Sequence, residues 1–429
     1  MNPESLAPPA LSPLRWFVSR EMVDMAALPP TLTTGQRIQA LRVRRGMSRP
    51  VLASLVGRSP GWLKAIEGDR LHPPRLPMLV KLATAMHVED LAELTGSVSM
   101  PMEQFSASEH PALSVVRRAV DSAPLGLPDG PPPNLEYIAA ALAAGWQARD
   151  TRGDHRTALG ELLPSLITHA SIAASHPDVA DPRRAQILYA SALNLVQMYS
   201  AYQGDGHLVW RVAERSLATA RAAGDEAAIG QACWFLVQAF RESGQWESAE
   251  TLTEDSLRLL DPVRNNSPEL LSAWSSMAFH SAITHARAGD KGIAWGWHDR
   301  GAKAALKLPP TWWSSPTSAS RSAVAIHGVT VAVELHQPGA ALDWSRKIND
   351  ELIPARPRRA RHLIEVARAH AQIGEHDQVA DLVTAAVAAA PETPRWNRET
   401  AELVNGLLDG PASVRPAGRR LAAAVGIAA

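Results

Sequence analysis

Short amphipathic segments follow one another between residues 35 and 94, each carrying apolar residues three or four positions apart. That spacing is typical of helices that bury one face, because 3.6 residues complete a helical turn. It predicts a compact bundle of five short helices. The predicted inward-facing residues are Ile38 and Leu41, then Leu52, Ala53 and Leu55, then Leu63 and Ile66, then Leu76, Leu79, Val80, Leu82 and Ala83, with a last helix over Val88–Leu94.

Start and stop signals separate the first three of these helices. Ser48 and Ser59 are placed as N-caps, since a serine oxygen accepts hydrogen bonds from the free N–H groups of a first turn. Pro60 follows the second cap, at a position where a missing N–H costs little. Gly46 and Gly57 stand at helix ends, where glycine readily adopts a left-handed turn. Three helices in close succession are therefore predicted.

Longer, alanine-rich helical segments occupy the chain from Asn134 onward, and short Gly/Asp turns separate them. In the clearest unit, a helix leading to Phe240 is followed by the turn Ser243–Trp246 and a return helix with Ala249. The next unit repeats this pattern 45 residues later. Its turn glycine is Gly289 and its matching alanine is Ala294, and weaker copies lie around Gly204–Asp205, around Gln337–Gly339 with Ala341, and around Ile373–His376 with Ala380.

These units predict a stack of helical hairpins. Small residues at a helix crossing let two antiparallel helices approach closely, and each hairpin must pack on its neighbours to bury its second face. We therefore expect an all-α protein in which a superhelical solenoid follows the small bundle. The predicted organisation is a flexible arm over 1–32, a helix-turn-helix domain over 33–97, a linker over 98–133 with one helix near Pro111–Ala123, and the repeat domain over 134–429.

Composition agrees with a multidomain globular protein. The chain has 429 residues, of which 46% are apolar, and this exceeds what one compact core requires. Its single cysteine, Cys233, excludes an internal disulfide framework and fits a reducing cytoplasm. The start of the sequence lacks the basic and apolar runs of a secretion signal, and no apolar stretch is long enough to span a bilayer. We therefore expect a cytoplasmic protein without a membrane partner.

Charge is distributed unevenly although the formal net charge of the chain is zero. Residues 35–87 contain ten arginines and lysines against Glu67 and Asp69, a local net charge of +8. A positive field of this kind favours binding of nucleic acid; the alternative interpretation is a basic face that is simply solvated.

The segment Met47–Gly68 carries a specific motif: Ser-x-x-x-Leu-Ala, Val-Gly, Ser-x-x-x-Leu and Ile-Glu-x-Gly in succession. Together with its flanks, about sixty residues in all, it resembles the lambda-repressor-like (Xre-type) helix-turn-helix domain. The resemblance implies that the third helix enters the major groove of double-stranded DNA while the second helix begins on phosphate. It places Arg49 at that phosphate and makes the DNA-facing edge Arg58, Ser59, Pro60, Gly61, Trp62, Lys64, Ala65 and Arg70.

This edge departs from well-known members of the family. Pro60, Gly61 and Ala65 stand where those members carry base-reading polar side chains, and none of the three can form a bidentate base contact. Direct readout would then fall to Arg58, Lys64 and Trp62, or shape and phosphate contacts would carry more of the specificity. For Glu67 we expect a structural hydrogen-bonding role.

The second half resembles the tetratricopeptide-type arrays found behind Xre-type domains in actinobacterial regulators. The resemblance implies that the first helix of each hairpin lines a concave surface on which small molecules or peptides bind. A polar and aromatic mixture suits ligand capture there, although ordinary packing is the alternative. The candidate effector-binding residues are Gln231, Trp234, Gln238, Arg241, Phe279 and Ile283.

Catalytic signatures are missing from the sequence, which has no glycine-rich phosphate loop, no Gly-x-Ser-x-Gly elbow and no His-Glu-x-x-His helix. We predict no enzyme activity, no metal and no cofactor, and we interpret the loop around Trp312–Trp313 as a cap over the solenoid groove. The predicted function is a sequence-specific transcriptional regulator that binds operator DNA as a homodimer and senses an effector. The alternative is an interaction scaffold or antitoxin-like regulator whose repeat domain docks a protein partner.

Overall fold

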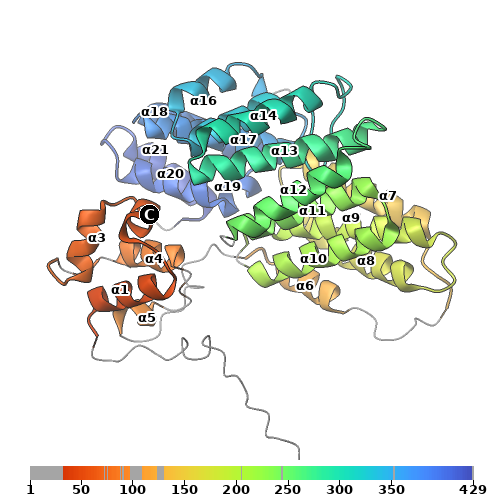
Figure 1. The fold of residues 1–429 in the computed structure, drawn as a ribbon, viewed down its shortest axis with the longest axis horizontal. Coiled ribbons are helices and arrows are strands. Elements are labelled where there is room, and N and C mark those ends of the chain that lie inside the picture. The colour runs from red at the N-terminus through yellow and green to blue at the C-terminus, as the bar shows by residue number, and fades with distance from the viewer. Residues whose placement is uncertain are drawn as a thin grey trace, which may run out of the picture. The chain divides into compact units, whose positions relative to one another are not determined.

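The computed structural model divides the chain into two compact units, residues 1–106 and 107–429, and each is described here by itself. All the secondary structure it describes is helical, which confirms the all-α prediction (Figure 1). The arm expected over 1–32 lies outside the described residues except for Leu32. The structure describes residues 32–71, 73–74, 76–86, 88, 91–96, 109–122, 130–203, 205–242, 245–350 and 353–427.

The first unit contains five helices among its described residues, as the apolar pattern predicts. The expected caps are present: the Ser48 hydroxyl accepts from the N–H of Val51, and the Ser59 hydroxyl accepts from the N–H of Trp62. Gly57 adopts a φ of +66° in the turn between the second and third helices. The helices are α1 (Thr34–Arg44), α2 (Arg49–Leu55), α3 (Pro60–Glu67), α4 (Leu76–Ala85) and α5 (Ala92–Thr95).

The inward faces of these helices form one hydrophobic core. One residue predicted to belong to it, Leu55, does not. Leu55 is 58% exposed, whereas Val56, which the apolar pattern did not indicate as inward-facing, is buried. The helix ends at Leu55, so the following turn swings Val56 inward. The buried core is Ile38, Leu41, Leu52, Ala53, Val56, Leu63, Ile66, Leu79, Leu82, Ala83, Met86, Val88, Leu91 and Leu94.

Gly35 sets the distance between α1 and α3. A Cβ atom at this position would lie 2.2 Å from the backbone oxygen of Ile66, well inside contact distance. The two helices can approach this closely only because residue 35 has no side chain. The start of α1 is fixed as well, since Thr33 and Gln36 form a reciprocal capping box.

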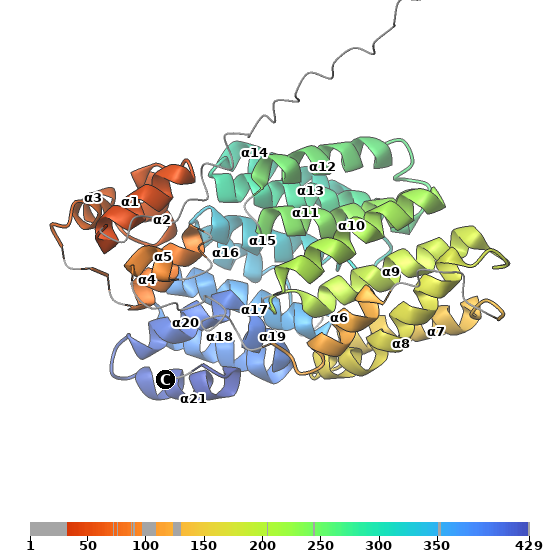
Figure 2. The ribbon, with the colours of Figure 1, turned by 90° about the horizontal axis from the view of Figure 1, so that it is seen from below.

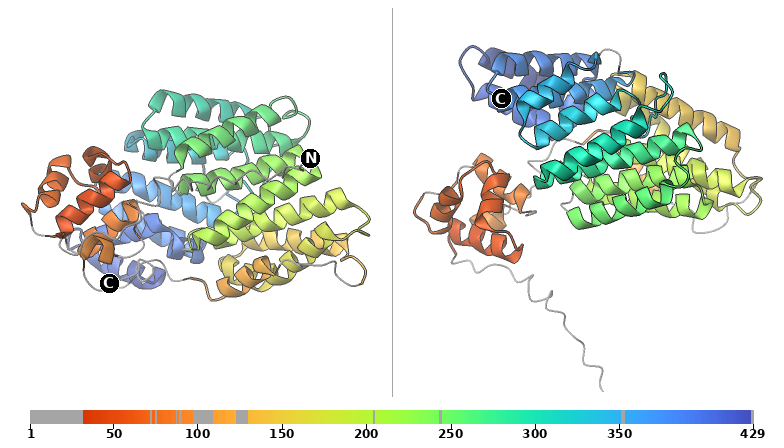
Figure 3. Two further views of the ribbon diagram at one scale, coloured as in Figure 1. Left: turned by 60° about the horizontal axis from the view of Figure 1, so that its bottom comes forward. Right: turned by 45° about the horizontal axis from the view of Figure 1, so that its top comes forward.

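The second unit consists of antiparallel helical hairpins that follow one another in chain order, as Figures 1 and 3 show. The expected crossing residues are buried: Ala249, Ala294 and Ala341 have no exposed surface, and Ala380 is 7% exposed. The predicted turn glycine Gly244 lies outside the described residues. The paired helices are α7 (Leu135–Thr151) with α8 (His155–Ser175), α9 (Pro182–Ser200) with α10 (Gly206–Ala223), α11 (Glu226–Glu242) with α12 (Trp246–Leu260), α13 (Pro268–Ala288) with α14 (Lys291–Ala305), α15 (Ala323–Glu334) with α16 (Pro338–Ser345), α17 (Arg356–Gln372) with α18 (His376–Ala389), and α20 (Arg398–Leu408) with α21 (Arg415–Val425).

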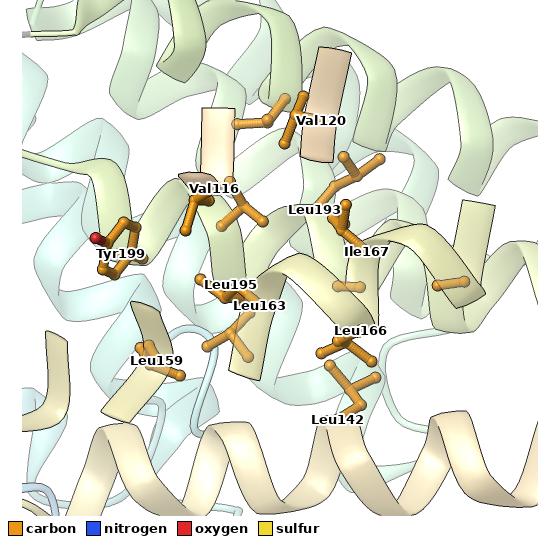
Figure 4. Close-up of a cluster of buried hydrophobic side chains, with 14 of the residues drawn as sticks. Val116, Val120, Leu142, Leu159, Leu163, Leu166, Ile167, Leu193, Leu195 and Tyr199 are labelled. Carbon is orange, nitrogen blue, oxygen red and sulfur yellow. The ribbon is translucent and has the colours of Figure 1, made fainter. Parts of the chain in front are cut away.

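A helix from the expected linker joins this unit. Helix α6 (Leu113–Asp121) packs against α8, and its apolar face consists of Leu113, Val116 and Val120, all buried. Figure 4 shows Val116 and Val120 among the side chains of one apolar cluster of this unit. The segment that we expected to link the domains therefore contributes a helix to the second unit.

The superhelix curls far enough for late elements to meet early ones, and Figure 2 shows α19 (Glu392–Trp396) beside the region of α8. The carboxylate of Glu392 accepts from the backbone N–H of Arg156 at 2.5 Å and from the Thr157 hydroxyl at 2.7 Å. The indole N–H of Trp313 donates to Asp150 on α7 at 3.0 Å. These contacts bring the inner faces of the hairpins around a common centre. Among the described residues, no helix is long and apolar enough to cross a bilayer.

Candidate functional site

The start of α3 presents the side chains that the sequence assigns to DNA. Pro60 and Gly61 are exposed behind the Ser59 cap, and they leave the first turn of α3 without long side chains. Arg58, Lys64 and Arg70 are exposed. Among the described residues none of these three has a carboxylate partner, and the only hydrogen bond that their side chains make there is from Arg70 to the backbone oxygen of Lys64 at 3.4 Å. Their charges are therefore free to meet an anionic partner.

Trp62 is partly buried against the core and partly exposed to solvent. Its ring packs against the apolar core of the first unit while remaining partly exposed. The guanidinium of Arg58 lies 5.8 Å from the ring centroid, within the range of a cation–π contact. Ala65 is likewise partly exposed. Trp62 thus helps to hold Arg58 beside the start of α3.

Glu67 has the structural role that the sequence suggested. Its carboxylate is buried and accepts from Nε of Arg42 at 2.5 Å, from Nη2 of Arg42 at 3.1 Å and from Nε of Arg49 at 2.6 Å. Arg49, expected at a phosphate, thus already holds a carboxylate, and its side chain is 38% exposed. Arg42 and Arg37 are buried, and Arg37 donates to the backbone oxygen of Leu32. Counting charge along the sequence therefore overstates the field that DNA would meet.

A cavity of about 150 Å³ lies at the centre of the second unit. Its walls come from α7, α8, α9, α11, α13, α15, α17 and α19, so it forms only because the superhelix brings early and late hairpins together. Four of the six candidate effector residues line it: Trp234, Gln238, Arg241 and Ile283.

The other two candidates lie elsewhere. Gln231 is partly exposed on α11 and is not part of the cavity wall. Phe279 is 1% exposed and packs so closely on Gly301 that a Cβ there would lie 3.0 Å from its ring. Its ring also stacks on His327 at 4.6 Å between centroids. Phe279 is therefore a core residue that supports a cavity residue, and helical spacing alone could not show which side of α13 faces the centre.

Three histidines contribute neutral polar groups to the cavity: His155 and His280, which are buried, and His327, which is partly exposed. Burial lowers the pKa of His155, His280 and His327 well below the usual value. Neighbouring arginines lower these values further. The Nδ1 atoms of all three rings lack a hydrogen-bond partner among the described residues. At neutral pH each ring can thus donate to or accept from a ligand.

Sequence reasoning missed most of the cationic wall. Arg156 lies 70 residues before the start of α11 and Arg358 lies 116 residues after its end, and only the closure of the superhelix brings them to its centre. One signal was present: the start of α17 reads Arg356-Pro-Arg-Arg-Ala-Arg361, an arginine density unusual for a helix that packs on both sides. The loop before α15 also reaches the cavity, through Thr317 and Ser318 and not through its tryptophans.

The tryptophans of that loop form hydrogen bonds to residues on two different helices. The indole N–H of Trp312 donates to the Ser272 hydroxyl at 2.5 Å, and Trp313 and Ser315 both donate to the carboxylate of Asp150. Asp150 also pairs with Arg149 at 2.8 Å. The loop thereby ties α13 to α7 across the cavity.

Two short helices joined by a tight glycine turn, the second carrying free cations, define a helix-turn-helix DNA-binding domain. The first unit has this architecture, and a unit of helical hairpins follows it along the chain.

Comparison with known protein families agrees with a helix-turn-helix domain in the first unit. Residues 34–95 match the family model described as a helix-turn-helix domain, a span that includes all five helices of the first unit. No curated protein matches the chain. The crystal structure of Bacillus thuringiensis PlcR in complex with the peptide PapR7 and DNA is similar over 63% of this chain and 94% of that chain, with 11% sequence identity and a TM-score of 0.26.

Proposed function

We propose that the protein is a sequence-specific transcriptional regulator whose repeat unit senses a ligand and assembles the homodimer. The observation that carries the DNA-binding part is the contrast within the first unit. Arg37, Arg42 and Arg49 are engaged internally, whereas Arg58 and Lys64 have no carboxylate partner among the described residues. Unpaired cations at the start of a recognition helix suit phosphates and base edges.

The test begins with selection of bound duplexes from a random DNA pool by the full-length protein. Lys64→Ala should then weaken binding to the selected duplex and reduce the slope of log K against log salt by about one, because each lost phosphate contact releases about one counterion fewer. Lys81→Ala is the matched control, since Lys81 is an exposed lysine on α4, outside the predicted DNA face. Failure to select any sequence, or equal effects of the two variants, would contradict the assignment.

Ligand sensing is supported by the cavity in the second unit. Four of the residues chosen from sequence line one concave space together with unsatisfied polar groups, as ligand sites commonly do. Sensing requires linkage: a ligand that changes operator affinity by some factor must have its own affinity changed by the same factor when operator is bound. Titrations of operator with and without ligand, and of ligand with and without operator, test this reciprocity.

Dimerisation through residues 134–429 is the remaining part of the proposal. One recognition helix reads one half-site, and two-fold pairing doubles the readout on a near-palindromic operator. Light scattering of the full-length protein should therefore report a dimer at micromolar concentration. A monomer both free and bound to the selected duplex would refute this part.

A further inference from the structure

The lining of the cavity in the second unit contains more arginines than acidic residues. Six arginines and two glutamates line it. Glu242 lies exposed at the end of α11, and Glu365 is held by Arg368 at 2.8 Å. Carboxylates beside the wall pair with three of the arginines: Asp150 lies 2.8 Å from Arg149, Glu334 lies 3.5 Å from Arg287, and Glu399 lies 3.9 Å from Arg361.

Three of the arginines have no carboxylate partner among the described residues: Arg156, Arg241 and Arg358. Arg156 donates only to backbone carbonyls, including that of Ala201 at 2.9 Å. Arg241 is 7% exposed, and its Nε and Nη1 atoms have no hydrogen-bond partner in the part of the chain that the structure describes. Burial lowers the pKa of each guanidinium to about 10, so all three stay charged at neutral pH. An unpaired buried charge is unfavourable unless something else compensates it.

We infer that the cavity binds a small organic anion, a carboxylate or a phosphate with an apolar or aromatic body, whose charge pairs with Arg241 and Arg358. The inference rests on the proposed sensing function and names the chemistry of its ligand. A guanidinium matches a carboxylate or phosphate through two parallel hydrogen bonds, which makes arginine the residue best suited to this role.

Other groups in the cavity fit the same ligand. Burial lowers the pKa of His327, and the positive charges of Arg358 and Arg241 lower it further, as expected for a ring near both guanidinium groups. The Trp234 and His280 rings lie 4.7 Å apart and form an aromatic wall, and Ile283 adds an apolar surface. The anion and its body would thus meet different parts of one cavity.

The volume restricts the ligand to small molecules. A cavity of about 150 Å³ is comparable to an engineered apolar cavity that accepts a benzene ring. A folded partner has no room there, and a peptide could place only a terminal carboxylate or one side chain inside. We therefore expect a ligand the size of a substituted aromatic acid.

The test uses isothermal titration of the full-length protein with three probes: benzoate, benzamide as the neutral molecule of the same shape, and inorganic phosphate. Benzoate should bind at least about tenfold more tightly than benzamide, since a hydrogen bond to a charged group contributes more than a neutral one. Arg241→Met should weaken benzoate by about tenfold to a hundredfold. Tighter binding of phosphate than of benzoate would support a phosphoryl ligand.

The direction in which Arg241→Met changes the melting temperature distinguishes a binding role of Arg241 from a structural one. Without ligand, Arg241→Met should unfold at the same temperature as the parent protein or higher, because it removes an unpaired buried charge. Arg258→Met, at an arginine that is 74% exposed on α12, is the control and should change neither binding nor melting. Equal binding of benzoate and benzamide, no binding of any probe at millimolar concentration, or benzoate affinity unchanged in Arg241→Met would overturn the inference.

These outcomes are distinguishable from failure of the proposed function. DNA selection and the Lys64→Ala comparison need no ligand, so DNA binding stands or falls independently. If benzoate binds through Arg241 while operator affinity stays constant, the anion site is upheld and the sensing function is refuted.

Discussion

Removal of the Glu67 carboxylate should unfold the DNA-binding unit while the repeat unit stays folded. Glu67 and Arg42 are 1% and 8% exposed in their side chains, and Glu67 is the only carboxylate that Arg42 contacts among the described residues. Glu67→Ala leaves the Arg42 guanidinium buried and unpaired. Breaking a buried ion pair in this way costs about 3–5 kcal/mol. Folded domains have free energies of unfolding of about 5–15 kcal/mol, and a unit of this size falls at the lower end.

Arg49→Ala should cost much less, although its bond to Glu67 is equally short. The Arg49 side chain is 38% exposed, and partly exposed ion pairs contribute only about 0–1 kcal/mol because solvent screens them. Glu67→Gln should fall between these two variants, since the amide keeps an acceptor oxygen and the volume of the side chain. Glu93→Ala provides the control, because that acidic side chain is exposed in the same unit.

Hydrogen exchange with peptide-level mass spectrometry measures both units in the full-length chain. Protection of peptides from residues 34–96 should collapse in Glu67→Ala, while peptides from residues 109–427 keep the parent rates, since local opening free energies are read separately. The reasoning is refuted if Glu67→Ala lowers the opening free energy of the first unit by less than about 1 kcal/mol. Equal losses in Glu67→Ala and Arg49→Ala would refute it too, because burial would then not decide the energy.

Two further predictions concern the repeat unit. Burial lowers the pKa of His362 to about 4, so between pH 6.5 and 4 the unfolded chain takes up a proton that the folded chain refuses, and stability should fall as pH falls. Denaturant titrations should show that His362→Gln reduces this fall by about 1.4 kcal/mol per pH unit, and an unchanged pH dependence would contradict the burial argument. Ala294→Leu should destabilise by about 1–3 kcal/mol through overpacking at the crossing of α13 and α14, where Ala294 has no exposed surface. Ala222→Leu at an exposed site of α10 is its control, and equal melting of both variants would count against close packing there.

Local signals in the sequence account for most of the fold. Each cap, turn glycine and crossing alanine acts within one helix or one hairpin, so its consequence can be predicted from neighbouring residues alone. The prediction that Leu55 faces inward was wrong because the same pattern allows α2 to end one residue earlier or later. That single residue decides whether the side chain at position 55 or at position 56 is buried.

The site depended on information that the sequence does not display locally. The pairing of Arg42 and Arg49 with Glu67 joins residues 25 and 18 positions apart, and it removed two cations from a field that seemed to belong entirely to DNA. In the repeat unit, Trp234 and Arg241 could be found from helical spacing on α11. Their partners across the cavity could not, because the curvature of a superhelix accumulates from many small rotations between hairpins.

Buried arginines occur in both units, and the difference between them is the strongest argument that the cavity is a binding site. In the first unit Arg42 is buried with its counter-ion, at 2.5 Å from Glu67, as a structural ion pair requires. In the second unit Arg149 is likewise buried with a counter-ion, at 2.8 Å from Asp150. Arg241 is buried to a similar extent and has no such partner among the described residues. Arg42 and Arg149 show that this chain can bury a guanidinium together with its carboxylate. Arg156 and Arg241 are buried without one among the described residues, and both line a cavity in which an anion from outside can supply the missing charge.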